Sequence, residues 1–187
     1  IEACTFIIAA AITHSSLLIK RIKYDHIAKF LEIMLEMGLE FKLINEAIFI
    51  EKCKKLSSIS IKTKEYPGFP TDLQAQLMTL ACVSNGKSYI EESIFENRFM
   101  HVPELNRLGA DIQIKGNSAI INGNCSFIGA EVMATDLRAS VSLILAALIA
   151  EGKTKINRIY HLDRGYENID YKLSTCGAAI KRGKNES

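Results

Sequence analysis

The chain has 187 residues, of which 48% are hydrophobic, and this is enough for one domain with a substantial core. Its 23 basic and 21 acidic residues are interspersed and leave a net charge of +2, which excludes a strongly basic surface for nucleic acid or for an anionic membrane. Five scattered cysteines with no Cys-x-x-Cys pair indicate reduced thiols in a cytoplasmic protein. Because the chain has no Walker loop, no dinucleotide-binding glycine motif and no metal-like spacing of its four histidines, we expect neither a cofactor nor a metal.

The pattern of apolar and polar residues repeats three times along the chain. Each copy contains a strongly apolar helix, a strand and an amphipathic helix that ends at a glycine, and these glycines (Gly38, Gly109 and Gly177) lie about 70 residues apart. The most apolar runs, at 4–12 and 141–150, are too short to span a bilayer and are predicted to be helices buried on every side. The repeat is therefore a whole supersecondary unit.

The predicted elements follow the same order in each copy. In the first copy, which begins inside the unit and lacks its opening strand, they lie at 4–12, 17–22, 25–37 with Asp25 as the N-cap, 40–43 and 47–51. In the second copy they lie at 60–64, 73–83, 89–95, 99–108, 111–115 and 119–122. In the third copy they lie at 127–133, 137–150, 154–160, 165–176 and 178–181.

The position of the apolar segments favours one fold class. A doubly wound parallel sheet would place the most apolar segments in its strands, whereas here they are helices and the strands alternate. The sequence therefore predicts an α+β fold: an inside-out αβ domain of three repeated βαβαββ-type modules over 1–182, with the first module truncated and a polar tail at 183–187. The truncation predicts a sheet edge with unpaired backbone groups in the first module.

Asp72 is the first candidate for chemistry, and two interpretations of it remain open. Thr71 is predicted to cap the following helix, with Gln74 at capping-box spacing, so Asp72 is a first-turn acid that the helix dipole favours without any functional role. Alternatively, the rigid approach through Pro67 and Pro70 presents the Asp72 carboxylate and free backbone N–H groups to a ligand.

Two arginines are predicted at helix starts, where the dipole disfavours a cation. Arg138 follows Thr135, the predicted N-cap of the third apolar helix, and Arg164 precedes the last helix. An anionic ligand would offset this mismatch, since a guanidinium binds phosphate or carboxylate with two parallel hydrogen bonds. Pairing of each arginine with a neighbouring acid, such as Asp163 or Glu167, is the equally open structural alternative.

Four segments of the chain together resemble one enzyme family. These segments are FPTDLQAQ at 69–76, IFENRFMH at 94–101, MATDLRAS at 133–140 and IYHLDRGYE at 159–167. They resemble the bacterial UDP-N-acetylglucosamine carboxyvinyltransferases, enolpyruvyl transferases of peptidoglycan synthesis, and the resemblance runs from residue 1 to about residue 182. That family has two similar inside-out αβ domains with the active site between them, and this chain resembles the second domain.

The resemblance implies a reaction and a set of site residues. The enolpyruvyl group of phosphoenolpyruvate passes to the 3-hydroxyl of UDP-N-acetylglucosamine through a tetrahedral intermediate, and phosphate is released. The resemblance implies Asp72 as the candidate base that also holds the sugar, and Arg164 as a second catalytic residue. It implies that Arg138 and Arg164 bind the anion derived from phosphoenolpyruvate, and that Thr71, Ile94 and Phe95 contact the substrates, Ile94 through its backbone.

The resemblance also implies that half of the active site lies outside this chain. The family's Lys-Asn pair, its mobile loop with a catalytic Cys and further substrate-binding arginines belong to the first domain, and no match to them occurs here. We therefore expect the partners of this chain to be the two substrates and the missing N-terminal domain, and we expect the fragment alone to be inactive. A non-catalytic paralogue or regulatory domain that binds a phosphorylated ligand is the alternative.

Overall fold

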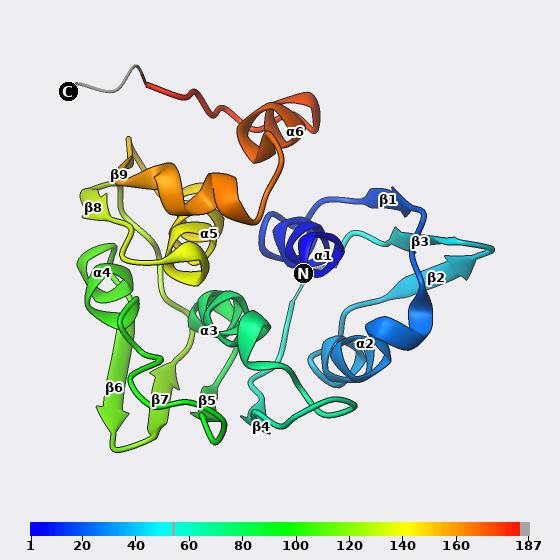
Figure 1. Cartoon of the computed structure of the whole chain (residues 1–187), viewed down its shortest axis with the longest axis horizontal. Helices are drawn as coiled ribbons and strands as arrows, with labels where there is room; N and C mark the ends of the chain where they lie inside the picture. Colours follow the sequence, from blue (N-terminus) through cyan, green and yellow to red (C-terminus); the bar gives the residue numbers. More distant parts are fainter. Residues whose placement is uncertain (54, 184–187) are drawn as a thin grey trace.

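The computed structural model describes residues 1–53 and 55–183 and places three apolar helices at the centre of the molecule (Figure 1). These helices are α1 (Glu2–Ile12), α3 (Gln74–Val83) and α5 (Leu137–Ala147). Every residue of α3 from Gln74 to Cys82 is buried, because other helices, strands or loops cover all of its sides. The predicted all-round burial of the apolar helices is confirmed most fully for α3.

The three central helices run in the same direction, with their N-terminal ends together. Thr5, near the start of α1, donates a hydrogen bond to Gln76, near the start of α3, at 2.6 Å. Thr79 of α3 donates to the carbonyl oxygen of Ser142 at the corresponding position in α5, at 3.3 Å. The polar residues that precede α3 and α5 are therefore brought to the same end of the helix layer.

Three sheets surround the central helices (Figure 1). In the first, β3 (Ala47–Ile50) lies between β1 (Leu17–Lys20) and β2 (Phe41–Ile44), and both pairings are antiparallel. The second has the order β4 (Ser60–Lys62), β5 (Lys87–Glu91), β7 (Ser118–Asn122) and β6 (Asp111–Lys115), with β4 parallel to β5. The third is the parallel pair of β8 (Glu131–Met133) and β9 (Lys155–Asn157).

The α-helices α2 (Ala28–Glu36), α4 (Val102–Arg107) and α6 (Ile169–Thr175) lie at the periphery (Figure 1). The chain also forms the 3₁₀ helices η1 (Tyr24–His26), η2 (Thr71–Leu73) and η3 (Ile159–Arg164). The second module contains the full set of elements, and in both the second and third modules a parallel strand pair flanks the buried helix. The predicted α+β fold of three related modules is confirmed. Within the described residues, β1 pairs only with β3.

The glycines that end the amphipathic helices behave as predicted. At Gly109, φ is +103°, and the next residue, Ala110, donates its N–H back to the carbonyl oxygen of Leu105 at 3.1 Å. This left-handed turn is strained for residues with a Cβ atom, so glycine at this position lets α4 stop and β6 begin at once.

Several predicted element boundaries are wrong. Asp25 lies inside η1 instead of capping α2, which begins at Ala28 after Ile27. The strand predicted over 127–133 is limited to β8, with one isolated bridge from Ile128 to Glu151, and the helix predicted over 99–108 is limited to α4. The strand predicted over 178–181 does not form, because Ala178 hydrogen-bonds to Leu173 at the end of α6 and Ile180 hydrogen-bonds to Ala178. Apart from Gly183, the predicted polar tail lies outside the described residues.

His101 is an ionisable residue in the core beside α4. It is only 2% exposed, and its Nε2 atom has no hydrogen-bond partner among the described residues. Burial lowers the pKa of His101 to about 4, and the nearby Asp136 carboxylate opposes this shift only in part. Folding therefore requires this imidazole to be neutral.

We expect this histidine to make the folded chain sensitive to acid. The folded-state pKa is about 4 and the ordinary value is 6.5, so between these pH values the unfolded chain binds the extra proton. The free energy of unfolding should fall by about 3 kcal/mol more for the wild-type chain than for His101→Gln as the pH drops from 6.5 to 4. Urea titrations of both proteins across this range measure the difference, and parallel pH profiles would contradict it.

Candidate active site

Asp72 lies in a short 3₁₀ turn, η2, that leads directly into α3. Phe69 and Leu73 are buried on either side of it and anchor the turn in the core. The Asp72 side chain remains 41% exposed, so a ligand can reach its carboxylate. The predicted capping box is wrong, because Thr71 makes no capping hydrogen bond; its hydroxyl donates to Glu92 instead, at 2.8 Å.

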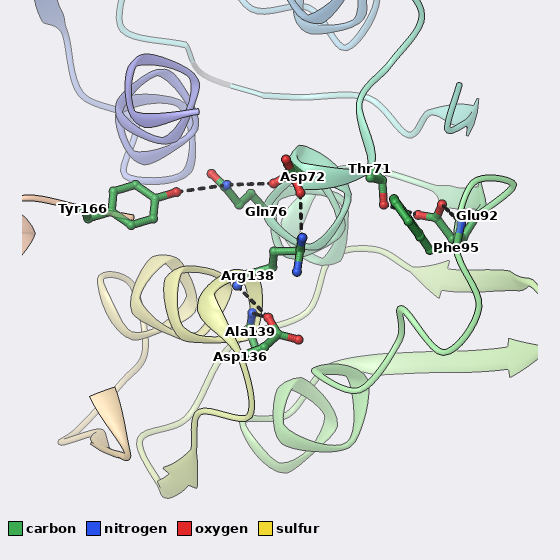
Figure 2. Close-up of polar contacts among 9 residues, drawn as sticks. All are labelled: Thr71, Asp72, Gln76, Glu92, Phe95, Asp136, Arg138, Ala139 and Tyr166. Atoms are coloured by element: carbon green, nitrogen blue, oxygen red, sulfur yellow. Dashed lines mark hydrogen bonds and ion pairs between the residues drawn. The ribbon is translucent and has the colours of Figure 1, made fainter. Parts of the chain in front are cut away.

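Arg138, in the first turn of α5, forms an ion pair with Asp72 (Figure 2). Its Nε atom donates to Asp72 Oδ1 at 2.8 Å, which joins the starts of α3 and α5. In the described part of the chain, no side chain or carbonyl accepts a hydrogen bond from its two terminal nitrogens, and the Arg138 side chain is 31% exposed. Arg138 is therefore paired with an acid, as the structural alternative has it, but the partner is Asp72 from another module and not Asp163 or Glu167.

Asp136, not the predicted Thr135, is the N-cap of α5. Its carboxylate accepts the backbone N–H groups of Arg138 at 2.7 Å and of Ala139 at 3.0 Å (Figure 2). Two carboxylates, those of Asp72 and Asp136, thus lie beside the first turn that carries Arg138. Together they offset the unfavourable position of a cation at a helix N-terminus.

Arg164 is exposed at the end of η3 and is not at a helix start, because α6 begins only at Ile169. Arg164 forms no ion pair with any of the residues that the structure describes. Its neighbour Asp163 pairs with Arg182 at 2.6 Å, and this contact holds the pKa of Asp163 below its usual value. The predicted pairing of Arg164 with Asp163 or Glu167 is therefore not found.

The η3 turn is nevertheless packed against the start of α5. A Cβ atom at Gly165 would lie 2.6 Å from Cδ2 of Leu137, so the backbone after Arg164 approaches the residue before Arg138 closely. Only glycine allows this approach without a shift of Leu137. The two arginines are thus carried by segments in direct contact with each other.

A buried polar network lies behind Asp72, and it was not predicted from the sequence. Thr5 and Tyr166 share a hydrogen bond at 2.8 Å, and Gln76 donates from Nε2 to the Tyr166 hydroxyl at 3.3 Å and to the carbonyl oxygen of Asp72 at 3.4 Å (Figure 2). Burial raises the pKa of Tyr166 to about 12, so its hydroxyl keeps its proton. The network connects α1, the Asp72 turn and the segment after Arg164; the only signal in the sequence was a polar residue inside an apolar helix.

Ile94 and Phe95 lie in a loop after β5, not in the predicted strand, which ends at Glu91. They line a hollow of about 800 Å³ together with Lys62, Arg98 and Asn117. The Phe95 ring is 52% exposed, and the Arg98 guanidinium lies 4.3 Å from its centre. Asp72, Arg138 and Arg164 do not line this hollow.

The hollow and the Asp72 turn are connected by Glu92. This buried carboxylate contacts Thr71 on one side and the backbone of Ile94 and Phe95 on the other (Figure 2). The structure thus brings Asp72 and Arg138 into contact and connects Thr71 to Ile94 and Phe95 through Glu92. Among the described residues, the Arg164 side chain forms no ion pair with either group.

The described part of the chain has neither a metal-binding cluster nor a membrane-spanning helix. Among residues 1–53 and 55–183, no three His, Cys, Asp or Glu side chains are grouped so that they could hold a metal ion. Over the same residues, every helix is too short or too polar to cross a lipid bilayer.

Comparisons with known proteins identify the family of this chain. Residues 1–173 match the family model of EPSP synthase (3-phosphoshikimate 1-carboxyvinyltransferase). Over 97% of its length the chain is 59% identical to the UDP-N-acetylglucosamine 1-carboxyvinyltransferase of Pelagibacter ubique and 53% identical to that of Campylobacter fetus. It covers 44% and 43% of these relatives, so it spans less than half of their length.

Solved structures support the same assignment. The enolpyruvyl transferase NikO from Streptomyces tendae has a TM-score of 0.90 and 28% identity over 96% of this chain, which covers 43% of NikO. EPSP synthase from Acinetobacter baumannii has a TM-score of 0.78 at 19% identity over 97% of this chain and 46% of its own, and this similarity shows the fold alone. The chain belongs to the EPSP synthase (3-phosphoshikimate 1-carboxyvinyltransferase) family.

Proposed function

We propose that this chain is the second domain of a two-domain enzyme that transfers the enolpyruvyl group of phosphoenolpyruvate to the 3-hydroxyl of UDP-N-acetylglucosamine. The observation that carries the proposal is the Asp72–Arg138 ion pair at the converging N-terminal ends of α3 and α5. The 59% identity to a UDP-N-acetylglucosamine 1-carboxyvinyltransferase supports the choice of acceptor, and the 44% coverage of that relative supports a further domain.

Asp72 acts on the sugar hydroxyl. The hydroxyl oxygen forms a bond to C2 of phosphoenolpyruvate as a general acid of the first domain gives a proton to C3, and Asp72 accepts the hydroxyl proton. In the second step, phosphate leaves C2 and a base of the first domain removes a proton from C3, which restores the double bond in the product. Because a carboxylate is a weak base compared with an alkoxide, the correct placement of Asp72 contributes to the rate alongside its role as proton acceptor.

Arg138 and Arg164 bind the anionic substrate. The Nε of Arg138 is held by Asp72, so its two terminal nitrogens can present a planar pair of donors to a carboxylate or phosphate. The N-terminal ends of α3 and α5 add partial positive charge at the same place. Arg164 is exposed on a segment packed against the start of α5, and it can approach the same anion from η3.

Ile94 and Phe95 contact the nucleotide sugar beside the hollow. The exposed Phe95 ring offers an apolar surface, and its loop is linked through Glu92 to the turn that carries Asp72. On this arrangement the nucleotide lies along the hollow, with the sugar directed toward Asp72. Thr71 contributes by holding this turn in place.

The direct test is an assay of phosphate release from phosphoenolpyruvate. The full-length protein should release phosphate only when UDP-N-acetylglucosamine is also present, and the 187-residue chain alone should release none above background because groups of the first domain are required. Release by the chain alone would contradict the division of the site between two domains. Tight binding of phosphoenolpyruvate by the full-length protein without release would favour the alternative of a non-catalytic ligand-binding domain.

Exchange of the arginines for lysine tests their role in binding the anion. In the full-length protein, Arg138→Lys and Arg164→Lys should each raise the KM for phosphoenolpyruvate about tenfold, because an ammonium group cannot reproduce the two parallel hydrogen bonds of a guanidinium. The matched control is Arg107→Lys, which changes an exposed arginine at the end of α4. A large fall in melting temperature with unchanged kinetics would show that the arginines serve the fold instead.

A further inference from the structure

Glu92 is a buried carboxylate without a cation. It lies directly after β5 and is only 3% exposed, and no Lys, Arg or His side chain of the described residues lies within ion-pair distance of it. Burial of a carboxylate is costly unless its oxygen atoms receive hydrogen bonds. The surroundings of Glu92 must therefore supply donors, and they do so from three separate segments.

Four donors surround the Glu92 side chain. Its Oε1 accepts the hydroxyl of Thr63, at 2.8 Å, and the backbone N–H groups of Ile94, at 3.0 Å, and Phe95, at 3.3 Å. Its Oε2 accepts the hydroxyl of Thr71 at 2.8 Å. Figure 2 shows the carboxylate between the Thr71 side chain and the loop that carries Phe95. One side chain thus joins the turn before α3 to the loop after β5.

This connection fixes the position of the Asp72 turn relative to the loop that lines the hollow. Thr71 immediately precedes Asp72, and its buried hydroxyl is directed at Glu92. Thr63 strengthens the connection, because its hydroxyl also accepts the backbone N–H of Ser93 at 2.9 Å. A change in the Glu92 carboxylate would therefore move the Asp72 turn and the 93–95 loop relative to each other.

We propose that Glu92 is a positioning residue that sets the distance between the Asp72 carboxylate and the loop at Ile94 and Phe95, so that the acceptor hydroxyl meets Asp72. This inference rests on the proposed function. It predicts that loss of the carboxylate affects the nucleotide sugar and the rate more than the binding of phosphoenolpyruvate, because Arg138 is anchored on α5 and Arg164 on η3. The alternation along β5 places Glu92 on the same inward face as the buried Ser88 and Ile90. A positioning role explains why a charged residue occupies this position.

The experiment compares Glu92→Ala and Glu92→Gln in the full-length protein. Alanine removes both acceptor atoms, and we expect the KM for UDP-N-acetylglucosamine to rise at least tenfold and kcat to fall at least tenfold, with the KM for phosphoenolpyruvate within about twofold of wild type. Glu92→Gln should change the KM for UDP-N-acetylglucosamine and kcat less than Glu92→Ala does. The amide oxygen of glutamine can accept hydrogen bonds from the two backbone N–H groups, and its nitrogen can donate to the Thr71 hydroxyl once that hydroxyl rotates.

Two controls separate positioning from loss of folded protein. Glu131→Ala removes an exposed carboxylate of β8 that accepts a hydrogen bond from Asn157 and forms an ion pair with Lys155, and it should leave both KM values unchanged. Damage to folding lowers the fraction of active enzyme, and so lowers the apparent kcat with both KM values at wild-type levels. That pattern in the Glu92 variants would overturn the positioning role.

Amide hydrogen exchange separates this inference from the proposed function. The N–H groups of Ile94 and Phe95 should exchange at least tenfold faster in full-length Glu92→Ala than in wild type, while the amides of α5 keep their rates. If the wild-type protein transfers no enolpyruvyl group, the proposed function fails, and faster exchange at these two amides together with residues 71–73 still supports the coupling of the two segments. Unchanged exchange at these positions would overturn it.

Discussion

The parallel packing of α1, α3 and α5, with their N-terminal ends together, determines where the sheets, the outer helices and the site residues lie. Apolar residues cover these helices on all sides, so the sheets and the outer helices must surround them. The common direction also gathers three positive helix ends at one place. Arg138 lies at one of these ends, where the helix dipole disfavours its positive charge, and the carboxylates of Asp72 and Asp136 lie beside it. The site is therefore a consequence of how the core is packed.

Buried polar groups fix the ends of these helices. The network of Thr5, Gln76 and Tyr166 ties α1, α3 and the segment after Arg164 together, and Glu92 ties the start of α3 to the loop after β5. Such contacts stabilise little compared with the apolar core, but each has a specific geometry and a high cost when broken. They hold the functional side chains at the edge of the core, where Asp72 and Arg138 keep partial exposure to solvent.

The sequence predicts the fold well because burial leaves a strong pattern along the chain. An apolar helix such as α3 is visible directly, and a helix-ending glycine such as Gly109 marks a left-handed turn. Details that depend on tertiary contacts were predicted less well. Thr71 has the spacing of a helix cap, but the buried Glu92 carboxylate takes its hydroxyl. Arg164 lies before a helical pattern, but the chain forms η3 there and α6 starts only later.

The candidate site was predicted in its members but not in its connections. Asp72 and Arg138 were both singled out, yet their ion pair joins residues from different modules, and no local pattern predicts such a contact. Glu92 was missed although alternation along β5 places it on the inward face, where a carboxylate calls for an explanation. Tyr166 gave no signal, because its hydrogen bonds reach residues of α1 and α3 that are distant in sequence.

A double-mutant cycle on Asp72 and Arg138 tests whether these side chains act as one unit at the joined helix ends. The measured quantity is kcat/KM of the full-length protein for wild type, Asp72→Asn, Arg138→Lys and the double variant. We predict that the double variant loses less than the sum of the two single losses, by about 1 kcal/mol or more of coupling free energy. Losses that add to within about 0.3 kcal/mol would show that the two side chains act independently and would contradict the account.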